Sequence, residues 1–302
     1  MKITVGPGVM VAAAFVGPGT VTTASVAGAS SGVSLLWAVA ISVLATIVLQ
    51  ELSIRSALST NQDLAPLIRQ FGHDRGWGVP IALLILCSVG LGNAAYQSGN
   101  LAGAAMGLSG ATPVRFIHAV VVTGSFAAGL ILVDRYRLLE RAMLILVGLM
   151  TCLLTGLAVA CLPELITAHR QVVSNVHAFD ATVVLALIGT TVVPYNLFLH
   201  ATAVRHRWSG IALADALRQA RIESAGAIIV GGVVTAAIMI VATVVIAGDN
   251  SRPALEALQV GIDQRFPDIG RWAMGAGLFA AGLTSAIAAP VAAGWAVCGV
   301  TG

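Results

Sequence analysis

The sequence predicts an all-α integral membrane protein with about eight transmembrane helices. Of its 302 residues, 58% are hydrophobic and 10% are charged, and the mean hydropathy is +0.93. A water-soluble domain carries roughly 25% charged residues. The charges are also unevenly spread, so that residues 3–50 contain no Asp, Glu, Lys or Arg. Because a helix crosses the hydrocarbon core with roughly 20 apolar residues, such a stretch is long enough for two helices.

Each charge-free stretch predicts one or two membrane helices. In the first, the small residues at 29–32 mark the boundary between two helices, whereas the stretch 76–114 predicts one long helix. The expected transmembrane helices are residues 5–29, 33–54, 79–108, 114–133, 142–162, 181–204, 224–248 and 272–300. Residues 211–222 and 253–265 predict short amphipathic helices between them. The polar segments are too short for a soluble domain, so we expect a single membrane domain over residues 1–302.

The distribution of Lys and Arg predicts a cytoplasmic N-terminus in a plasma or inner cell membrane. With that orientation, eleven of the 16 Lys and Arg residues lie in inner segments and five in outer segments, which agrees with the positive-inside rule. The net charge of +3 therefore reflects topology. Because the Arg residues lie at helix ends and form no basic face, we expect the lipid bilayer and no nucleic acid as a partner. The sequence does not predict an oligomeric state.

Motifs of soluble enzymes are not found. The sequence contains no HExxH, GxSxG or P-loop, and no paired carboxylates within a predicted membrane helix. The four cysteines include no CxxC pair, and we interpret them as small apolar packing residues: Cys87, Cys152, Cys161 and Cys298. We therefore expect no enzyme activity and no cofactor.

Two of the predicted membrane helices contain an interruption. The first contains Gly17-Pro18-Gly19-Thr20, and the sixth contains Val193-Pro194-Tyr195-Asn196. Proline removes a backbone donor and clashes with the preceding turn, and glycine adds backbone freedom. Each could be a simple proline kink. Two breaks five helices apart, however, are expected of a LeuT-type five-plus-five inverted repeat, in which discontinuous helices 1 and 6 form a binding site near the bilayer midplane.

The residues around both breaks resemble the NRAMP family of proton-coupled divalent-metal transporters. In that family a Gly-Pro pair is followed eleven residues later by Asp-Pro-Gly-Asn, and here Gly6-Pro7 is followed at that spacing by Gly17-Pro18-Gly19-Thr20. The sixth helix, GTTVVPYNLFLH, resembles the family's G-A-x-x-M-P-H-N-x-x-L-H. The eighth, GLFAAGLTS, resembles G-L-x-A-A-G-Q-S-S. The family fold has eleven or twelve helices, so the resemblance implies that its last helices are missing from this sequence.

The departures from the family pattern concern the ligands themselves. In the family, the Asp and Asn of the first helix and the Met of the sixth coordinate the metal, and the resemblance places Gly17, Thr20 and Val193 there. An acidic pair on the third helix, part of the family's proton route, aligns with Gln97 and Asn100. A membrane proton relay usually needs buried Asp, Glu or His. We therefore expect transport that is not coupled to protons in the family's usual way.

The remaining candidate site is neutral and rich in oxygen atoms. We expect the substrate or metal to bind near Gly17, Thr20, Thr190, Val193, Tyr195 and Asn196. Pro18, Gly19 and Pro194 form the breaks. Polar residues that line a path are expected at Asn93, Gln97, Asn100 and His200. Threonine in a membrane helix often bonds its own backbone instead, and His200 could equally bond a neighbouring helix.

Three functions are compatible with this site. The first is secondary transport of a divalent metal ion by alternating access, with Mg²⁺ or Mn²⁺ ahead of Fe²⁺, because neutral oxygens suit hard, hydrated cations. The metal is then the transported substrate. The second is transport of another small solute or of Na⁺ by the same fold. The third is a membrane sensor or scaffold that has lost transport, because every charged ligand is absent.

Overall fold

The structure is a computed structural model that describes residues 7–133, 136–174, 180–246, 252–267 and 269–301. These residues form helices joined by turns, with no strand among them. The α-helices are α1 Pro7–Phe15, α2 Pro18–Ser31, α3 Leu36–Thr60, α4 Leu64–His73, α5 Gly78–Ile85, α6 Gly92–Ala111, α7 Phe116–Leu132, α8 Tyr136–Val173, α9 Ala181–Thr191, α10 Pro194–Arg207, α11 Leu213–Val245, α12 Ala254–Arg265 and α13 Gly270–Thr301.

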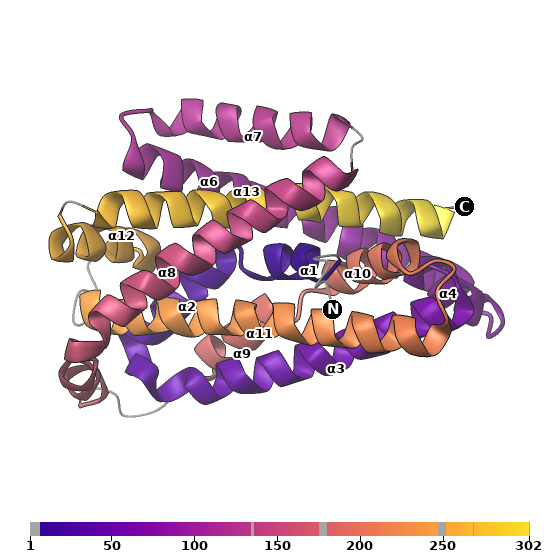
Figure 1. Ribbon diagram of the computed structural model, residues 1–302, viewed down its shortest axis with the longest axis horizontal. Coiled ribbons are helices and arrows are strands. Elements are labelled where there is room, and N and C mark those ends of the chain that lie inside the picture. The colour runs from indigo at the N-terminus through magenta and orange to yellow at the C-terminus, as the bar shows by residue number, and fades with distance from the viewer. Residues whose placement is uncertain (1–6, 134–135, 175–179, 247–251, 268, 302) are drawn as a thin grey trace.

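The long helices pack as a bundle around the short helix α1. Figure 1 shows α7 and α6 along one edge and α3 along the opposite edge, with α1 and α10 between them. Helix α8 crosses this bundle obliquely, and α1 packs against α8, α10, α11 and α13. Methionine, valine and phenylalanine side chains of α1 are buried in the process, among them Met10, Val11 and Phe15. A short helix interrupted after nine residues is therefore held in place by its neighbours rather than by its own length.

Six helical segments of the described residues are long and apolar enough to cross a membrane. One of them, Pro18–Thr60, contains both α2 and α3, which are separated by Gly32 at φ 59° and a 3₁₀ turn from Gly32 to Leu35. Helix α7 is apolar but has only 17 residues. Length and composition do not place the bilayer, so the number of eight transmembrane helices stays a prediction.

Three helices differ from the expected boundaries. The predicted amphipathic helix over 211–222 is wrong as a separate element, because α11 runs unbroken from Leu213 to Val245. Residues 213–225 contain neither Gly nor Pro, so nothing ends the helix there. Helix α8 likewise continues to Val173 with Pro163 inside it. The third predicted helix, 79–108, contains a π-helical turn over Leu86–Leu91 between α5 and α6, which its sequence does not indicate.

Close contact between α6 and α13 brings one face of α6 against the centre of the bundle. A Cβ atom built on Gly107 would lie 2.4 Å from the backbone nitrogen of Phe279, and one on Gly282 would lie 2.5 Å from that of Ala104. Glycine at these positions lets the two backbones approach, which is a common packing mode for membrane helices. The α6 residues on this face therefore meet the backbone of α13 directly.

Candidate functional site

The first helix break lies between α1 and α2. Helix α1 ends at Phe15, and α2 begins at Pro18, directly after Gly17 in an extended conformation (φ −98°, ψ 178°). Proline suits the first position of a helix because the N–H it lacks would have no partner inside the helix. Gly17 is buried and has no side chain of its own. The predicted discontinuity of the first membrane helix is confirmed.

The second break repeats this construction between α9 and α10. Helix α9 ends at Thr191 and α10 begins at Pro194, with Val193 extended between them (φ −93°, ψ 120°). Tyr195 connects the two breaks, because its buried hydroxyl donates a hydrogen bond to the carbonyl of Ala14 at 3.2 Å. The predicted discontinuity of the sixth helix is confirmed, and α10 packs against α1 near the centre of the bundle (Figure 1).

Side-chain hydroxyls donate hydrogen bonds to the last carbonyl oxygens of α1. Ser285 of α13 donates to Ala13 O at 3.3 Å, and Thr20 of α2 donates to Phe15 O at 2.9 Å. With Tyr195 on Ala14, three consecutive carbonyls thus accept hydroxyl protons from three different helices. These carbonyls have no intrahelical partner at a helix end, and the hydroxyls satisfy them without water. Sequence reasoning missed Ser285, since no local signal shows that this side chain faces α1.

The predicted ligands near the breaks differ in their surroundings. Asn196 is 2% exposed, and neither its Oδ1 nor its Nδ2 has a hydrogen-bond partner among the described residues. Thr20 is buried and keeps its oxygen lone pairs free while its proton bonds Phe15 O. Thr190 bonds Leu187 O in its own turn, and Val193 is buried and apolar. A role of any of them as ligand stays a prediction.

Two amides of the polar α6 face bond the backbone of α13. Asn93 Nδ2 donates to Ala289 O at 2.9 Å, and Gln97 Nε2 donates to Ala286 O at 3.0 Å. Pro290 explains the second contact. It lacks an N–H and lies four residues after Ala286, so the Ala286 carbonyl has no donor within its own helix. The proline is visible in the sequence, but its partner on α6 is not.

His200 has a specific partner on another helix. Its Nδ1 lies 2.8 Å from Oε1 of Gln50, and both side chains are about 1% exposed. The bond joins α10 to α3 one turn beyond the second break. The alternative that His200 bonds a neighbouring helix is therefore seen in the structure, and sequence reasoning missed Gln50.

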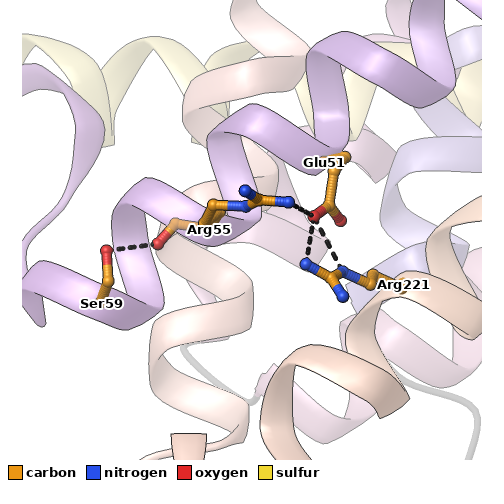
Figure 2. Close-up of polar contacts among 4 residues, drawn as sticks. All are labelled: Glu51, Arg55, Ser59 and Arg221. Atoms are coloured by element: carbon orange, nitrogen blue, oxygen red, sulfur yellow. Dashed lines mark hydrogen bonds and ion pairs between the residues drawn. The ribbon is translucent and has the colours of Figure 1, made fainter. Parts of the chain in front are cut away.

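Polar contacts tie four helices together at the end of the bundle where α3 and α10 end. Figure 2 shows Glu51 of α3 between Arg55 and Arg221, with Oε1 lying 3.0 Å from Arg55 Nη2 and 2.6 Å from Arg221 Nη2. Asp63 and Arg205 form a second bridge with two bonds of 2.8 and 2.9 Å.

Helix α1 is attached at the same end. The N–H of Gly8, in its first turn, donates to Glu223 Oε1 of α11 at 2.9 Å. A Cβ on Gly8 would lie 2.9 Å from the Glu223 carbonyl oxygen, so the two backbones are in direct contact. These contacts link α1 to α11, α11 to α3, and α10 to the residues that follow α3.

The described part of the chain holds no cluster of metal-binding side chains at the breaks. Among the described residues, no group of three or more His, Cys, Asp and Glu side chains could hold a metal ion. The atoms near the first break that could bind a cation are amide, hydroxyl and carbonyl oxygens. Such oxygens suit a hard cation that keeps part of its water shell.

Comparisons with known proteins agree with this geometry. The family model described as "Natural resistance-associated macrophage protein-like" matches residues 8–302. The divalent metal cation transporter MntH of Xanthomonas campestris is 31% identical over 251 residues, covering 80% of this chain and 55% of the relative. MntH of Verminephrobacter eiseniae is 27% identical over 299 residues, covering 95% of this chain and 66% of the relative.

Solved structures show the same fold. A manganese transporter of Eremococcus coleocola, in complex with an aromatic bis-isothiourea substituted compound, superposes with a TM-score of 0.81 at 21% identity. The match covers 98% of this chain and 65% of that one. The chain thus spans about six tenths of the length of the curated relatives it matches.

Proposed function

Because the chain belongs to the Nramp family, we propose that it carries a divalent metal cation across a membrane by alternating access, through a neutral site at the two helix breaks. The observation that carries this proposal is the contact of Tyr195 with Ala14, which joins the break of α9 and α10 to that of α1 and α2. The transporters named as its relatives handle divalent metal cations. We propose the same activity, transport of a divalent metal cation, for this chain.

The chemistry of the site favours Mg²⁺ or Mn²⁺ over softer metals. A thioether selects softer transition metals, and a buried valine, Val193, lies where the family has its methionine. Asn196, Thr20 and backbone carbonyls offer hard oxygen atoms without charge. A site of this kind binds weakly and suits an ion that retains several waters.

Coupling to protons through α6 is not part of this proposal. Gln97 and Asn100 occupy the positions of the family's acidic pair, and an amide does not titrate in the accessible pH range. Gln97 Nε2 is further held by Ala286 O. We infer that the ion moves down its own gradient, or with another ion, without a proton passing along this face.

The orientation of the protein follows from its positive charges. We infer that the N-terminus is cytoplasmic and that the end with the Glu51, Arg55 and Arg221 contacts faces the cytoplasm. The proposed location is the plasma or inner cell membrane.

Flux measurements test the proposed function. The protein is reconstituted in liposomes that contain a Mn²⁺-quenched dye or a pH dye, and a Mn²⁺ gradient is applied. We expect Mn²⁺ entry without acidification of the lumen, and about tenfold slower entry for the double variant Thr20→Ala, Asn196→Ala. Thr60→Ala, an exposed hydroxyl bonded within α3, is the matched control. Acidification in step with Mn²⁺ entry would contradict the uncoupled transport, and absence of Mn²⁺ entry would contradict transport itself.

A further inference from the structure

The space beside Gly17 is bordered by side chains from two other helices. A Cβ atom built on Gly17 would lie 2.8 Å from Ser285 Oγ of α13 and 3.6 Å from Asn100 Oδ1 of α6. A side chain at residue 17 would therefore lie next to two oxygen atoms, Ser285 Oγ and Asn100 Oδ1. Because glycine has none, α6 and α13 supply the polar atoms on this side of the break.

Asn100 brings a side-chain amide into this space, and one of its two polar atoms has no partner in the described part of the chain. It is 7% exposed, and its Nδ2 has no hydrogen-bond partner among the described residues. An unpartnered Nδ2 is a hydrogen-bond donor, so it calls for an acceptor such as a water oxygen and not for a cation. The case for a cation rests on the other atom of this amide, Oδ1. Asn100 lies in the interior of α6, next to an extended backbone, and its Oδ1 is the atom that faces Gly17.

Gln97 presents a second oxygen on the same face of α6. The two residues are three positions apart, so they are neighbours on the helix surface. The bond from Gln97 Nε2 to Ala286 O fixes the orientation of its amide, and its Oε1 is buried without a partner in the described chain. The Ala286 carbonyl, which Pro290 leaves without a donor in its own helix, thus binds the nitrogen end of the Gln97 amide and leaves its oxygen unpartnered.

The geometry points to a relocated ligand: Asn100 Oδ1 coordinates the divalent cation from α6, in place of a side chain at Gly17. Gln97 Oε1 then accepts a hydrogen bond from a water that the cation retains, and Ser285 Oγ borders the same space. This assignment rests on the proposed function, because it names a ligand of the same site. Amide oxygens are ordinary ligands of hard cations, and Mn²⁺ and Mg²⁺ commonly keep part of their water shell.

Calorimetric titration of Mn²⁺ into the purified protein and three single variants tests the assignment. We expect Asn100→Ala to weaken binding about fivefold, and Asn100→Asp, which keeps the shape and adds charge, to strengthen it about tenfold. Ser98→Ala is the matched control, since it removes a hydroxyl that is exposed and bonded within α6. It should bind as the unmodified protein does. Thermal melting without metal shows whether each variant is folded.

The outcomes separate the two proposals. A gain with Asn100→Asp, together with weaker binding by an Asn100→Ala variant that melts as a folded protein, supports the ligand assignment, because a nearby charge alone would raise the affinity without making the neutral amide a ligand. Mn²⁺ binding that is the same in the unmodified protein and in Asn100→Asp overturns the assignment while the proposed function stands. Absence of Mn²⁺ binding to the unmodified protein overturns both.

Discussion

Replacing Gly17 with Asp, in a chain that also carries Ser285→Ala, is expected to raise the affinity for Mn²⁺ about tenfold or more. The second change is needed because a Cβ on residue 17 would lie 2.8 Å from Ser285 Oγ. A carboxylate at this position faces the cation directly. Two unit charges about 4 Å apart attract by about 4 kcal/mol at an effective dielectric constant of 20. The affinity for Mn²⁺ should therefore still rise after the cost of desolvating the carboxylate is subtracted.

The matched control for this prediction is Gly17→Asn in the same Ser285→Ala background. Asparagine fills the same volume and also offers an oxygen, so the difference between the two variants isolates the charge. Calorimetric titration with Mn²⁺ gives both affinities. Equal affinities for the Asp and Asn variants would mean that residue 17 does not face the bound cation.

The bond between Gln97 and the Pro290 kink is expected to appear as a coupling of about 1 kcal/mol in a double-mutant cycle. Gln97→Leu leaves the Ala286 carbonyl buried without a donor, because Pro290 has no N–H. In a Pro290→Ala background the N–H of residue 290 satisfies that carbonyl, so the same Gln97→Leu change should cost less. Hydrogen bonds between membrane helices average about 0.6 kcal/mol, and a proline-freed carbonyl should exceed this.

Unfolding of the four proteins of this cycle in detergent provides the measurement. The unmodified protein and the two single variants give the separate costs, and the double variant gives the coupling. If the two changes add within experimental error, then the Ala286 carbonyl has another donor and the orientation inferred for the Gln97 amide is wrong. That result would also remove the basis for assigning its oxygen to the ion's water shell.

The helix breaks were predictable because their cause is partly local. Proline at residues 18 and 194 has no N–H and suits the first position of a helix. Proline alone does not decide a break, because Pro163 and Pro290 lie inside continuous helices. Their spacing of five helices added the expectation that the two breaks form one site, as in a five-plus-five inverted repeat. Their contact through Tyr195 and Ala14 depends on packing, and the pattern of residues gave no indication of which atoms would touch.

Most of the polar partners were not predictable, because they lie far apart in the sequence. Ser285 and Ala13 are 272 residues apart, and Gln97 and Ala286 are 189 apart. The sequence placed Gln97 and Asn100 on one polar face of a helix. It did not show that the Ala286 carbonyl of α13 accepts a hydrogen bond from the Gln97 amide. Likewise, the continuous α11 replaced a short helix predicted over 211–222 and a separate helix predicted over 224–248, because its polar first turns extend the apolar segment.

The most direct test of the account is a crystal structure of the protein grown with Mn²⁺ and recorded at the manganese absorption edge. We predict an anomalous peak between the two helix breaks, with Gly17 and Asn100 on one side and Asn196 on the other. A peak elsewhere along the bundle, or none at a saturating Mn²⁺ concentration, would contradict a neutral cation site at the point where the interrupted helices meet.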